Sequence, residues 1–365
     1  MPFRLEARGG HSALWSWLSP VVAIAATLVV SAVIFAIMGK PAGAALYTFV
    51  VAPVSDLNGI AELGVKAAPL VLIGVGLAIG FRANVWNIGA EGQFILGAIF
   101  GGGVGLAAGD ATGFWILPAM IVAGALGGMA WAAIPAFLKT RFNANEILTS
   151  LMLTYVAQLL LIYLVVGPWK DPEGYGFPQT RLFGDGATMP ILISGTRVHL
   201  GVLFALIAVA LGWLIHAKTL LGFKLRVLGQ APRAASYAGF STARLTWFSL
   251  LIGGATAGLA GVFEVAGPIG QITPSISPGY GFTAIIVAFL GRLHPVGVLL
   301  GGLVLALSYL GGEKAQIVLG LPNAVTGIYQ GILLFFLLAA DLMVGYRIRF
   351  TGKRPGKRQQ AGSAA

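Results

Sequence analysis

The stretch FRANVWNIGAEGQF, residues 81–94, decides how this sequence is read, because it places a polar cluster between two long apolar runs. It holds one Arg, two Asn, one Gln and one Glu, in a chain that is only 10% charged. Charged side chains at membrane depth cost about 2.5–3.5 kcal/mol each on insertion scales, so such a cluster is rarely accidental. Gly89 and Gly92 permit the close approach of another backbone. The stretch predicts a break between two membrane spans, with a helix N-terminus and its polar groups facing the protein interior.

Two residues of this stretch allow two interpretations. Asn87 is expected to cap a helix that begins at Ile88. Glu91 lies four residues later and would share a helix face with Asn87. Either these groups contribute to an interior site, or Asn87 is only a cap and Glu91 only offsets the helix dipole.

The composition is that of an integral membrane protein. The chain has 365 residues, of which 57% are hydrophobic, with 53 Gly and a mean hydropathy of +0.88. Soluble domains are about a quarter charged, and several apolar runs here can cross about 30 Å of hydrocarbon as helices. These runs do not alternate with period two, which argues against an outer-membrane barrel. The absence of Cys excludes disulfides and thiol chemistry.

The net charge of +11 reports orientation rather than a nucleic-acid partner. When ten spans are read with both ends inside, most of the 23 Lys and Arg residues fall on the inner side. The basic residues on the outer side are Lys40, Lys66, Lys170, Arg181, Arg197 and Lys314. This distribution is the positive-inside bias of membrane proteins, so both termini are expected in the cytoplasm.

The predicted fold is an all-α integral membrane protein of about ten transmembrane helices. Residues 1–17 are expected to form a cytoplasmic segment without a signal cleavage site, and residues 18–345 are expected to form the transmembrane domain. Residues 346–365 are expected to form a basic, disordered cytoplasmic tail near anionic headgroups. The spans are expected at about 18–38, 62–80, 88–108, 114–138, 147–166, 198–216, 245–266, 280–290, 296–310 and 323–343. A polar break after the second span and a Pro/Gly-broken segment before the short eighth span fit a 5+5 inverted repeat with discontinuous helices.

Further local patterns predict how the helices begin and pack. Residues 143–146 read NANE, an Asn followed three residues later by Glu, so Glu146 is expected to belong to a capping box. Thr154 and Gln158 share a face of the next span and are expected to hydrogen-bond a neighbouring helix.

Small residues and loops complete this outline. GxxxG pairs at 254–258, 297–301 and 327–331 predict tightly packed helix faces. The longest outer loop, residues 167–196, is rich in Pro, Gly and Asp, and its aromatic residues are expected at the membrane interface or against a soluble partner.

The inner segment 218–244 contains PRAASYAG, residues 232–239. Pro at a first helical position and Gly just past the end delimit a helix of about two turns. Such a helix is not stable alone in water, so it needs a surface to dock against. It could lie on lipid headgroups, but Arg233 is its only cation, which favours a protein partner.

Several chemistries have no counterpart in the sequence. There is no GxxxxGK[ST] motif for ATP and no GxSxG nucleophile context, and the four His are scattered without metal-ligand spacing. A proton-coupled carrier would place several carboxylates at mid-membrane, whereas only Glu91 and Glu264 are candidates here. The chain is therefore expected to be no enzyme and to hold no cofactor or metal ion of its own.

Three segments taken jointly resemble the permease subunit of a bacterial ABC importer, in the branch for simple sugars and nucleosides that is related to ribose and branched-chain amino-acid permeases. They read NVWNIGAEGQF at 84–94, NANEILTSLMLTY at 143–155 and FKLRVLGQAPRAASYAGFS at 223–241. The resemblance covers about residues 60–345. It implies a plasma-membrane assembly of two permease chains, identical or different, with two ATP-binding modules beneath them. A periplasmic or lipid-anchored protein would deliver the solute.

The resemblance also implies roles for individual residues. An ATPase-coupling segment would comprise Arg226, Gly229, Pro232, Arg233, Ala234, Ala235, Tyr237, Ala238 and Gly239. The polar residues that would line or shape the translocation path are Asn84, Asn87, Glu91 and Gln93, with Trp86 and Tyr155 available to stack on a ring. The solute could be a nucleoside, a pentose or a hexose. Alternatives are a stand-alone, ion-coupled secondary transporter of a small polar solute and, less consistent with the broken helices, a membrane scaffold.

Overall fold

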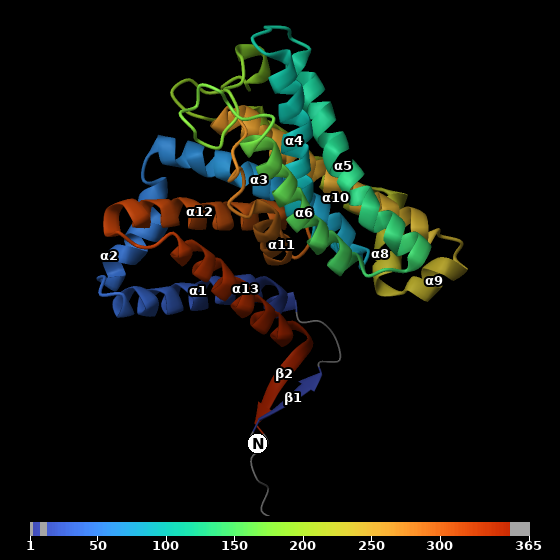
Figure 1. The fold of residues 1–365 in the computed structure, drawn as a ribbon. Helices are drawn as coiled ribbons and strands as arrows, with labels where there is room; N and C mark the ends of the chain where they lie inside the picture. The colour runs from blue at the N-terminus through green and yellow to red at the C-terminus, as the bar shows by residue number, and fades with distance from the viewer. Residues whose placement is uncertain (1–2, 8–12, 351–365) are drawn as a thin grey trace, which may run out of the picture.

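The computed structural model describes residues 3–7 and 13–350, and within them the chain is a bundle of α-helices (Figure 1). The first half contains α1 (Ala13–Ile37), α2 (Ala42–Leu46), α3 (Leu57–Arg82), α4 (Ala90–Ala108), α5 (Ile116–Phe142) and α6 (Glu146–Val166). The second half contains α7 (Leu200–Lys218), α8 (Leu220–Gln230), α9 (Pro232–Tyr237), α10 (Thr242–Glu264), α11 (Tyr280–Leu290), α12 (Pro295–Leu319) and α13 (Ala324–Gly345). A two-stranded ribbon pairs β1 (Phe3–Ala7) with β2 (Tyr346–Phe350).

Among the described residues, nine helices are long and apolar enough to cross a membrane, namely α1, α3, α4, α5, α6, α7, α10, α12 and α13. The predicted eighth span is α11, whose 11 residues extend only about 16 Å, roughly half of a hydrocarbon core. One predicted boundary is wrong, because α12 continues to Leu319 instead of ending near residue 310. Gly311 and Gly312 do not stop this helix. They lie where a side chain would collide with Phe49 and Thr326.

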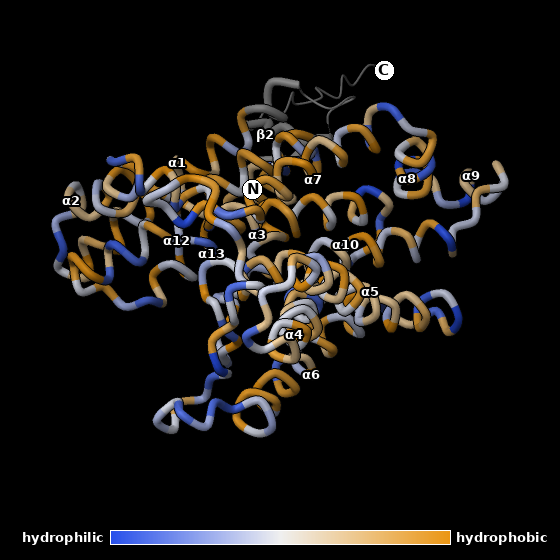
Figure 2. Tube along the Cα trace, turned by 90° about the horizontal axis from the view of Figure 1, so that it is seen from above, coloured by the Kyte–Doolittle hydropathy of each residue, from blue (hydrophilic) through white to orange (hydrophobic). Residues whose placement is uncertain are grey.

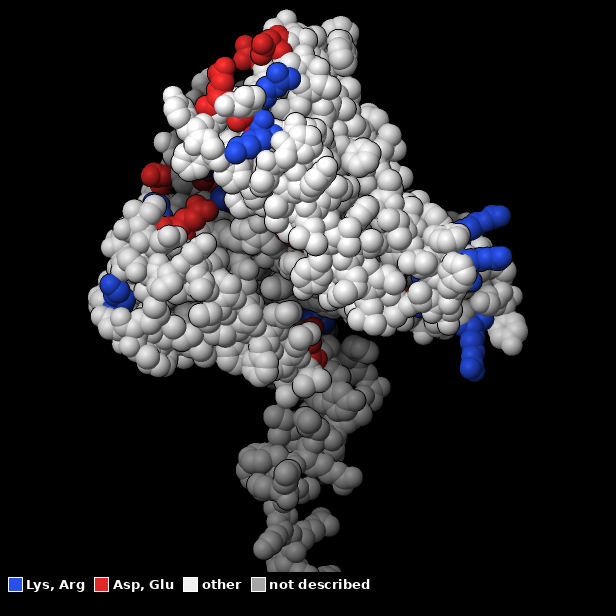
Figure 3. Space-filling view, viewed as in Figure 1, with Lys and Arg blue, Asp and Glu red and all other residues white. Residues whose placement is uncertain are grey.

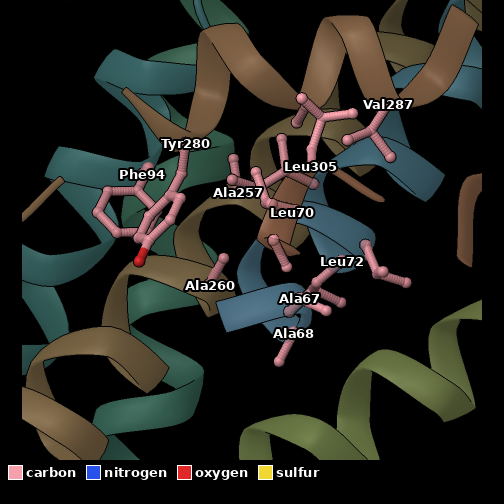
Figure 4. Packing of buried hydrophobic residues seen from close by; sticks show 14 of the residues in the cluster. Ala67, Ala68, Leu70, Leu72, Phe94, Ala257, Ala260, Tyr280, Val287 and Leu305 are labelled. Carbon is pink, nitrogen blue, oxygen red and sulfur yellow. The ribbon is translucent and has the colours of Figure 1, made fainter. Parts of the chain in front are cut away.

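Helices α3 and α10 form the centre of the bundle. Helix α10 packs against α3, α4 and α5, and the close view of the core shows side chains of α3, α4, α10, α11 and α12 meeting there (Figure 4). On α10, Gly254 and Gly258 lie against the backbone of Gly124 and Gly128 on α5, where any added side chain would collide. The tight face predicted at 254–258 is therefore confirmed.

The other two GxxxG pairs behave differently. Gly297 and Gly301 of α12 lie against the end of α11, with Gly291 and the Val287 carbonyl as neighbours. Gly327 and Gly331 of α13 have no described atom near them, so the predicted tight face at 327–331 is wrong within this chain. The reason is that α13 lies at the periphery, where it packs mainly on α1 and leaves its other face open.

The packing supports the predicted 5+5 repeat. Helix α3 packs on α10, α11 and α12, and α10 in turn packs on α3, α4 and α5. Likewise α4 contacts α5 and α6, as α11 contacts α12 and α13. The contacts therefore recur when α3, α4, α5 and α6 are exchanged for α10, α11, α12 and α13. The first helix of each half departs from the pattern, since α1 packs on α13 and α7 packs on α3 and α12.

The two ends of the described chain lie together. Strands β1 and β2 are antiparallel, with Phe3 opposite Phe350, which places both ends on one side of the bundle (Figure 1). Residues 346–350, predicted as the start of a disordered tail, instead form β2, because residues 3–7 supply backbone partners that the sequence does not reveal. The prediction for 351–365 lies outside the described residues.

Polarity separates the two faces of the bundle. Hydrophobic residues follow the helices, and hydrophilic ones collect in the connections (Figure 2). Basic side chains gather at the end formed by α8 and α9, which carry Arg226 and Arg233, whereas most of the acidic ones lie at other parts of the surface, notably around the loop between α6 and α7, where some basic side chains accompany them (Figure 3). This separation agrees with the assignment of α8 and α9 to the inner side.

Candidate functional site

The polar stretch is an interruption between α3 and α4, as predicted. Helix α3 ends at Arg82, and Asn84 adopts a left-handed conformation (φ 57°) that Asn tolerates better than most residues. The amides of Asn84 and Val85 fold back onto the carbonyls of Phe81 and Gly80. The helix expected from Ile88 begins at Ala90, with Gly89 at the cap position. Asn87 therefore lies outside the helix and shares no helix face with Glu91.

Asn87 and Gln93 pair with each other inside the protein. The Asn87 Nδ2 donates to Gln93 Oε1 at 2.8 Å, and Gln93 Nε2 donates to Asn87 Oδ1 at 3.0 Å. Asn87 also accepts from the Gly89 amide at 3.2 Å, and both side chains are only 1% exposed. Gly253 of α10 makes room for this pair, because a side chain there would come within 2.9 Å of the Asn87 amide nitrogen. The pair consequently fixes the shape of the interruption.

The start of α4 is pressed against α6. A Cβ on Gly92 would lie 2.8 Å from the Thr154 Cα, and one on Gly89 would lie 2.6 Å from the Ser150 carbonyl. The Ser150 hydroxyl also accepts from the Ile88 amide at 3.2 Å. The close approach predicted for the two glycines is confirmed, and α6 is the helix that makes it.

Two polar residues of α6 differ in their contacts. Gln158 donates to the carbonyl of Pro274 at 3.0 Å, so its bond leaves its own helix but goes to the turn before α11 and not, as predicted, to a neighbouring helix. Thr154 instead donates to Ser150 of the same helix, so its predicted bond to a neighbour is wrong. Its hydroxyl lies against Gly92 of α4, which has no side chain to bond with it.

The predicted capping box at 143–146 is also wrong. Asn143 ends α5 in a left-handed conformation (φ 52°), and Asn145 caps α6 by accepting from the Ile147 amide at 2.9 Å. Glu146 forms an ion pair with Lys139 at 2.9 Å. The connection between α5 and α6 is so short that one Asn terminates the first helix and another begins the second.

The predicted path residues fall into two groups. Asn87, Glu91 and Gln93 are buried and bonded within the chain, and Glu91 accepts from the Gly281 amide at 2.6 Å. Asn84 is exposed and accepts from the Trp86 indole at 2.9 Å, while the Trp86 ring lies 5.1 Å from that of Phe81.

Tyr155 does not join either group. It is 61% exposed on the open face of α6, which it shares with Met152 and Leu159. The structure does not bring it against residues 84–93.

The predicted short helix of the inner segment is confirmed as α9. Pro232 occupies its first position, and Gly239 follows it in a left-handed conformation (φ 77°). Within α9 only Ala235 is buried, whereas Tyr237 is 92% exposed. The helix thus presents nearly all of its surface to the inner side.

A contact that the sequence did not indicate connects this segment to the polar interruption. Gly229 of α8 lies directly against the carbonyl group of Arg82, the last residue of α3. Leu225 and Leu228 of α8, Ala235 of α9 and Val85 of the interruption are buried in one apolar cluster with the ends of α3 and α10. The cluster forms because α8 folds back under α3, so no spacing along the chain predicts it. A displacement of α9 can therefore reach residues 82–85 through packed atoms.

The outer end carries a separate open cleft. It has a volume of about 420 Å³ and lies between the end of α4 and the loop that begins at Pro168, with Trp169, Lys170, Asp171 and Arg181 in its wall. Arg181 donates to the carbonyl of Leu106 and so holds the loop against α4.

Comparison with known proteins identifies relatives along nearly the whole chain. A glucose ABC transporter permease protein of Haloferax volcanii is 37% identical over 363 residues, which cover 97% of this chain and 95% of that one. A guanosine ABC transporter permease protein of Bacillus subtilis is 32% identical, with 91% and 94% covered. A nucleoside ABC transporter permease protein of Lactococcus lactis subsp. cremoris is 25% identical, with 88% and 90% covered.

The family model described as branched-chain amino acid transport system / permease component matches residues 59–338. This range begins in α3, includes the interruption and the α8–α9 segment, and ends in α13. Together with the long apolar helices, it identifies a multi-pass plasma-membrane protein of a family of transport permeases. The chain belongs to the permease component family of branched-chain amino acid transport systems.

Proposed function

We propose that this chain is the membrane-spanning subunit of an ATP-driven importer for simple sugars or nucleosides. The observation that carries the proposal is the exposed helix α9, joined through Gly229 of α8 to the end of α3 at the polar interruption. A short helix with almost no burial of its own needs a partner surface. An ATPase with two nucleotide-binding modules would supply that surface and would bind all of the ATP.

The proposed mechanism follows the contacts inward from α9. Closure of the ATPase on ATP would displace α9 and, through the apolar cluster of Leu225 and Leu228, would displace α8. Gly229 would pass this displacement to Arg82 and so to the residues that interrupt the two helices. Discontinuous helices at the centre of a transporter are the elements that rearrange around a solute.

The path itself is proposed to lie between this chain and a second permease chain, which could be a different chain or a second copy. Helix α6 packs on one side only and exposes Tyr155 on the other. A second chain facing α6 would turn this surface into a wall of the path. At the interruption Asn84 is exposed and Trp86 is half-buried, and they would offer a polar partner and an aromatic surface.

The solute class is proposed from the chemistry of these accessible groups and from the relatives, whose names give glucose, guanosine and nucleosides as their solutes. An aromatic face beside amide oxygens and nitrogens suits a ring that carries hydroxyl groups. A periplasmic or lipid-anchored solute-binding protein would deliver it at the outer loop, where the charged cleft near Trp169 offers a contact surface.

Reconstitution tests the proposal. The chain, its partner permease and the ATPase would be placed in vesicles, and uptake of labelled guanosine, ribose and glucose would be measured with the binding protein outside and ATP at the ATPase. We expect uptake of one solute class that requires both ATP and the binding protein. Uptake by this chain alone, driven by an ion gradient, would refute the proposal in favour of a secondary transporter.

A further inference from the structure

The inference concerns Glu91, a carboxylate that lies where two helices begin. It belongs to the first turn of α4, which starts at Ala90 behind Gly89. Its Oε2 also accepts a hydrogen bond of 2.6 Å from the amide of Gly281, in the first turn of α11. The side chain thus reaches from the start of one interrupted helix to the start of the other, across 190 residues of sequence.

Both helix starts favour a nearby acceptor or negative charge. The first N–H groups of a helix have no partner within it, and the helix dipole places partial positive charge there. Neither Gly89 nor Gly279, the two cap residues, carries a side chain that could accept. Ser277 accepts from the amides of Gly279 and Tyr280, and Glu91 accepts from the next amide, that of Gly281. One carboxylate consequently lies at the positive ends of two helices.

No ordinary counter-ion accompanies this charge. Among the residues that the structure describes, the ion pairs involve four other carboxylates, and none includes Glu91. The residue is only 7% exposed. A buried carboxylate without a basic partner is stable only where hydrogen-bond donors and dipoles replace water. The Gly281 amide of α11 donates to it, and the N-terminal ends of α4 and α11 supply the dipoles.

The helices are in backbone contact at the same place. A Cβ on Gly281 would lie 2.5 Å from the Glu91 Cα and 2.7 Å from the Ala90 carbonyl carbon, so only glycine fits. One turn further along α4, the Phe94 ring meets the ring of Tyr280 edge to face, with centroids 6.0 Å apart (Figure 4). The backbone contact at Gly281 and the hydrogen bond of Glu91 therefore hold the same two helix starts together.

We infer that Glu91 is a positioning residue that holds the starts of α4 and α11 together as one rigid unit during transport and makes no contact with the solute. The uptake measurements rest on the proposed function, while the distance measurement below depends only on the assembled protein. The unit would give the two halves of the repeat a fixed junction, around which the remaining helices rearrange.

The first test uses Glu91→Gln, which keeps the shape and an acceptor oxygen but removes the charge. In the reconstituted assembly we expect normal assembly and an unchanged KM for uptake, with the maximal uptake rate lowered about tenfold. The matched control is Glu146→Gln, which removes another first-turn carboxylate, one that pairs with the Lys139 side chain at the end of α5 and reaches no second helix start. This control should leave both parameters unchanged.

Other results with Glu91→Gln would overturn the inference. A raised KM with an unchanged maximal rate would show contact with the solute. A loss of uptake that only follows a loss of assembled protein would show a purely structural role, and normal kinetics would show that the charge is dispensable. If the unmodified assembly takes up no solute with ATP, the proposed function fails instead, and that result is separate from all of these.

The second test measures the junction directly. The chain has no cysteine, so spin labels can be attached at Phe100→Cys on α4 and Phe282→Cys on α11, both at exposed side chains. Pulsed electron paramagnetic resonance should give the same distance in the nucleotide-free and ATP-trapped assembly. Adding Glu91→Gln should broaden that distance distribution. A distance that changes between the two states of the unmodified junction would refute the rigid unit.

Discussion

Gly229→Ala tests the contact through which the inner segment would reach the membrane interior. An added Cβ would collide with the Arg82 carbonyl oxygen and would lie 3.0 Å and 3.3 Å from the carbonyl carbons of Arg82 and Ala83. These are backbone atoms, so they cannot rotate away as a flexible side chain would. Helix α8 must therefore move off the end of α3.

The size of the effect follows from the packing. An extra methyl group forced into a packed contact typically costs about 1–3 kcal/mol. Because 1.4 kcal/mol corresponds to a factor of ten, we expect the solute imported per ATP hydrolysed to fall about tenfold. ATP hydrolysis itself should continue, since α9 keeps its exposed surface. The assay is parallel measurement of uptake and phosphate release in vesicles with the complete assembly.

Gly64→Ala is the matched control, because Gly64 also lies in a helix but has no neighbouring atom within 4 Å of an added Cβ. It should leave the ratio of uptake to hydrolysis unchanged. If Gly229→Ala leaves that ratio unchanged as well while the protein assembles normally, the contact between α8 and α3 does not transmit the movement, and the proposed coupling route is wrong.

Four further changes have distinct expected results. Tyr237→Pro alters the end of the exposed helix α9, so ATP hydrolysis should continue without matching solute uptake. Unchanged coupling would contradict a docking role for α9. Asn87→Ala leaves the buried Gln93 amide without its partner and should lower the free energy of unfolding by about 1–3 kcal/mol. The melting temperature should fall accordingly, and adding Gln93→Met to the same chain should partly restore it. Trp86→Ala should raise the KM for uptake about tenfold without a matching loss of assembled protein. An unchanged KM would exclude Trp86 from the path. Burial lowers the pKa of His199 to about 4, so the unfolded chain binds a proton before the folded chain does as the pH falls. The free energy of unfolding should therefore decline by up to about 3 kcal/mol between about pH 6.5 and 4. His199→Asn should flatten the slope of melting temperature against pH.

Local and compositional features were accessible from the sequence. Long apolar runs with few charges must be helices in a membrane, because only internal hydrogen bonding satisfies the backbone there. The polar break at 81–94 was predicted because polar side chains are costly at membrane depth. The short helix at 232–239 was predicted because Pro fixes φ at a helix start and Gly adopts the left-handed conformation that ends a helix. The joint resemblance of three segments to a permease family agreed with the family match across residues 59–338.

The failures share one physical cause. The partner of a polar or small residue is set by what packs beside it, and the sequence does not contain that information. Asn87 pairs with Gln93 rather than capping a helix, and Gly327 faces no described atom although its GxxxG spacing equals that of Gly254.

The sequence alone determined that the chain is a helical membrane protein of this orientation, since hydrophobic length and the placement of charge act residue by residue along the chain. Only the tertiary structure decided the contacts on which function depends. Gly229 meets Arg82, and Glu91 reaches Gly281, because helices distant in sequence cross at those points. Such crossings are selected by the packing of whole helix surfaces, so they become visible only when all the helices are in place.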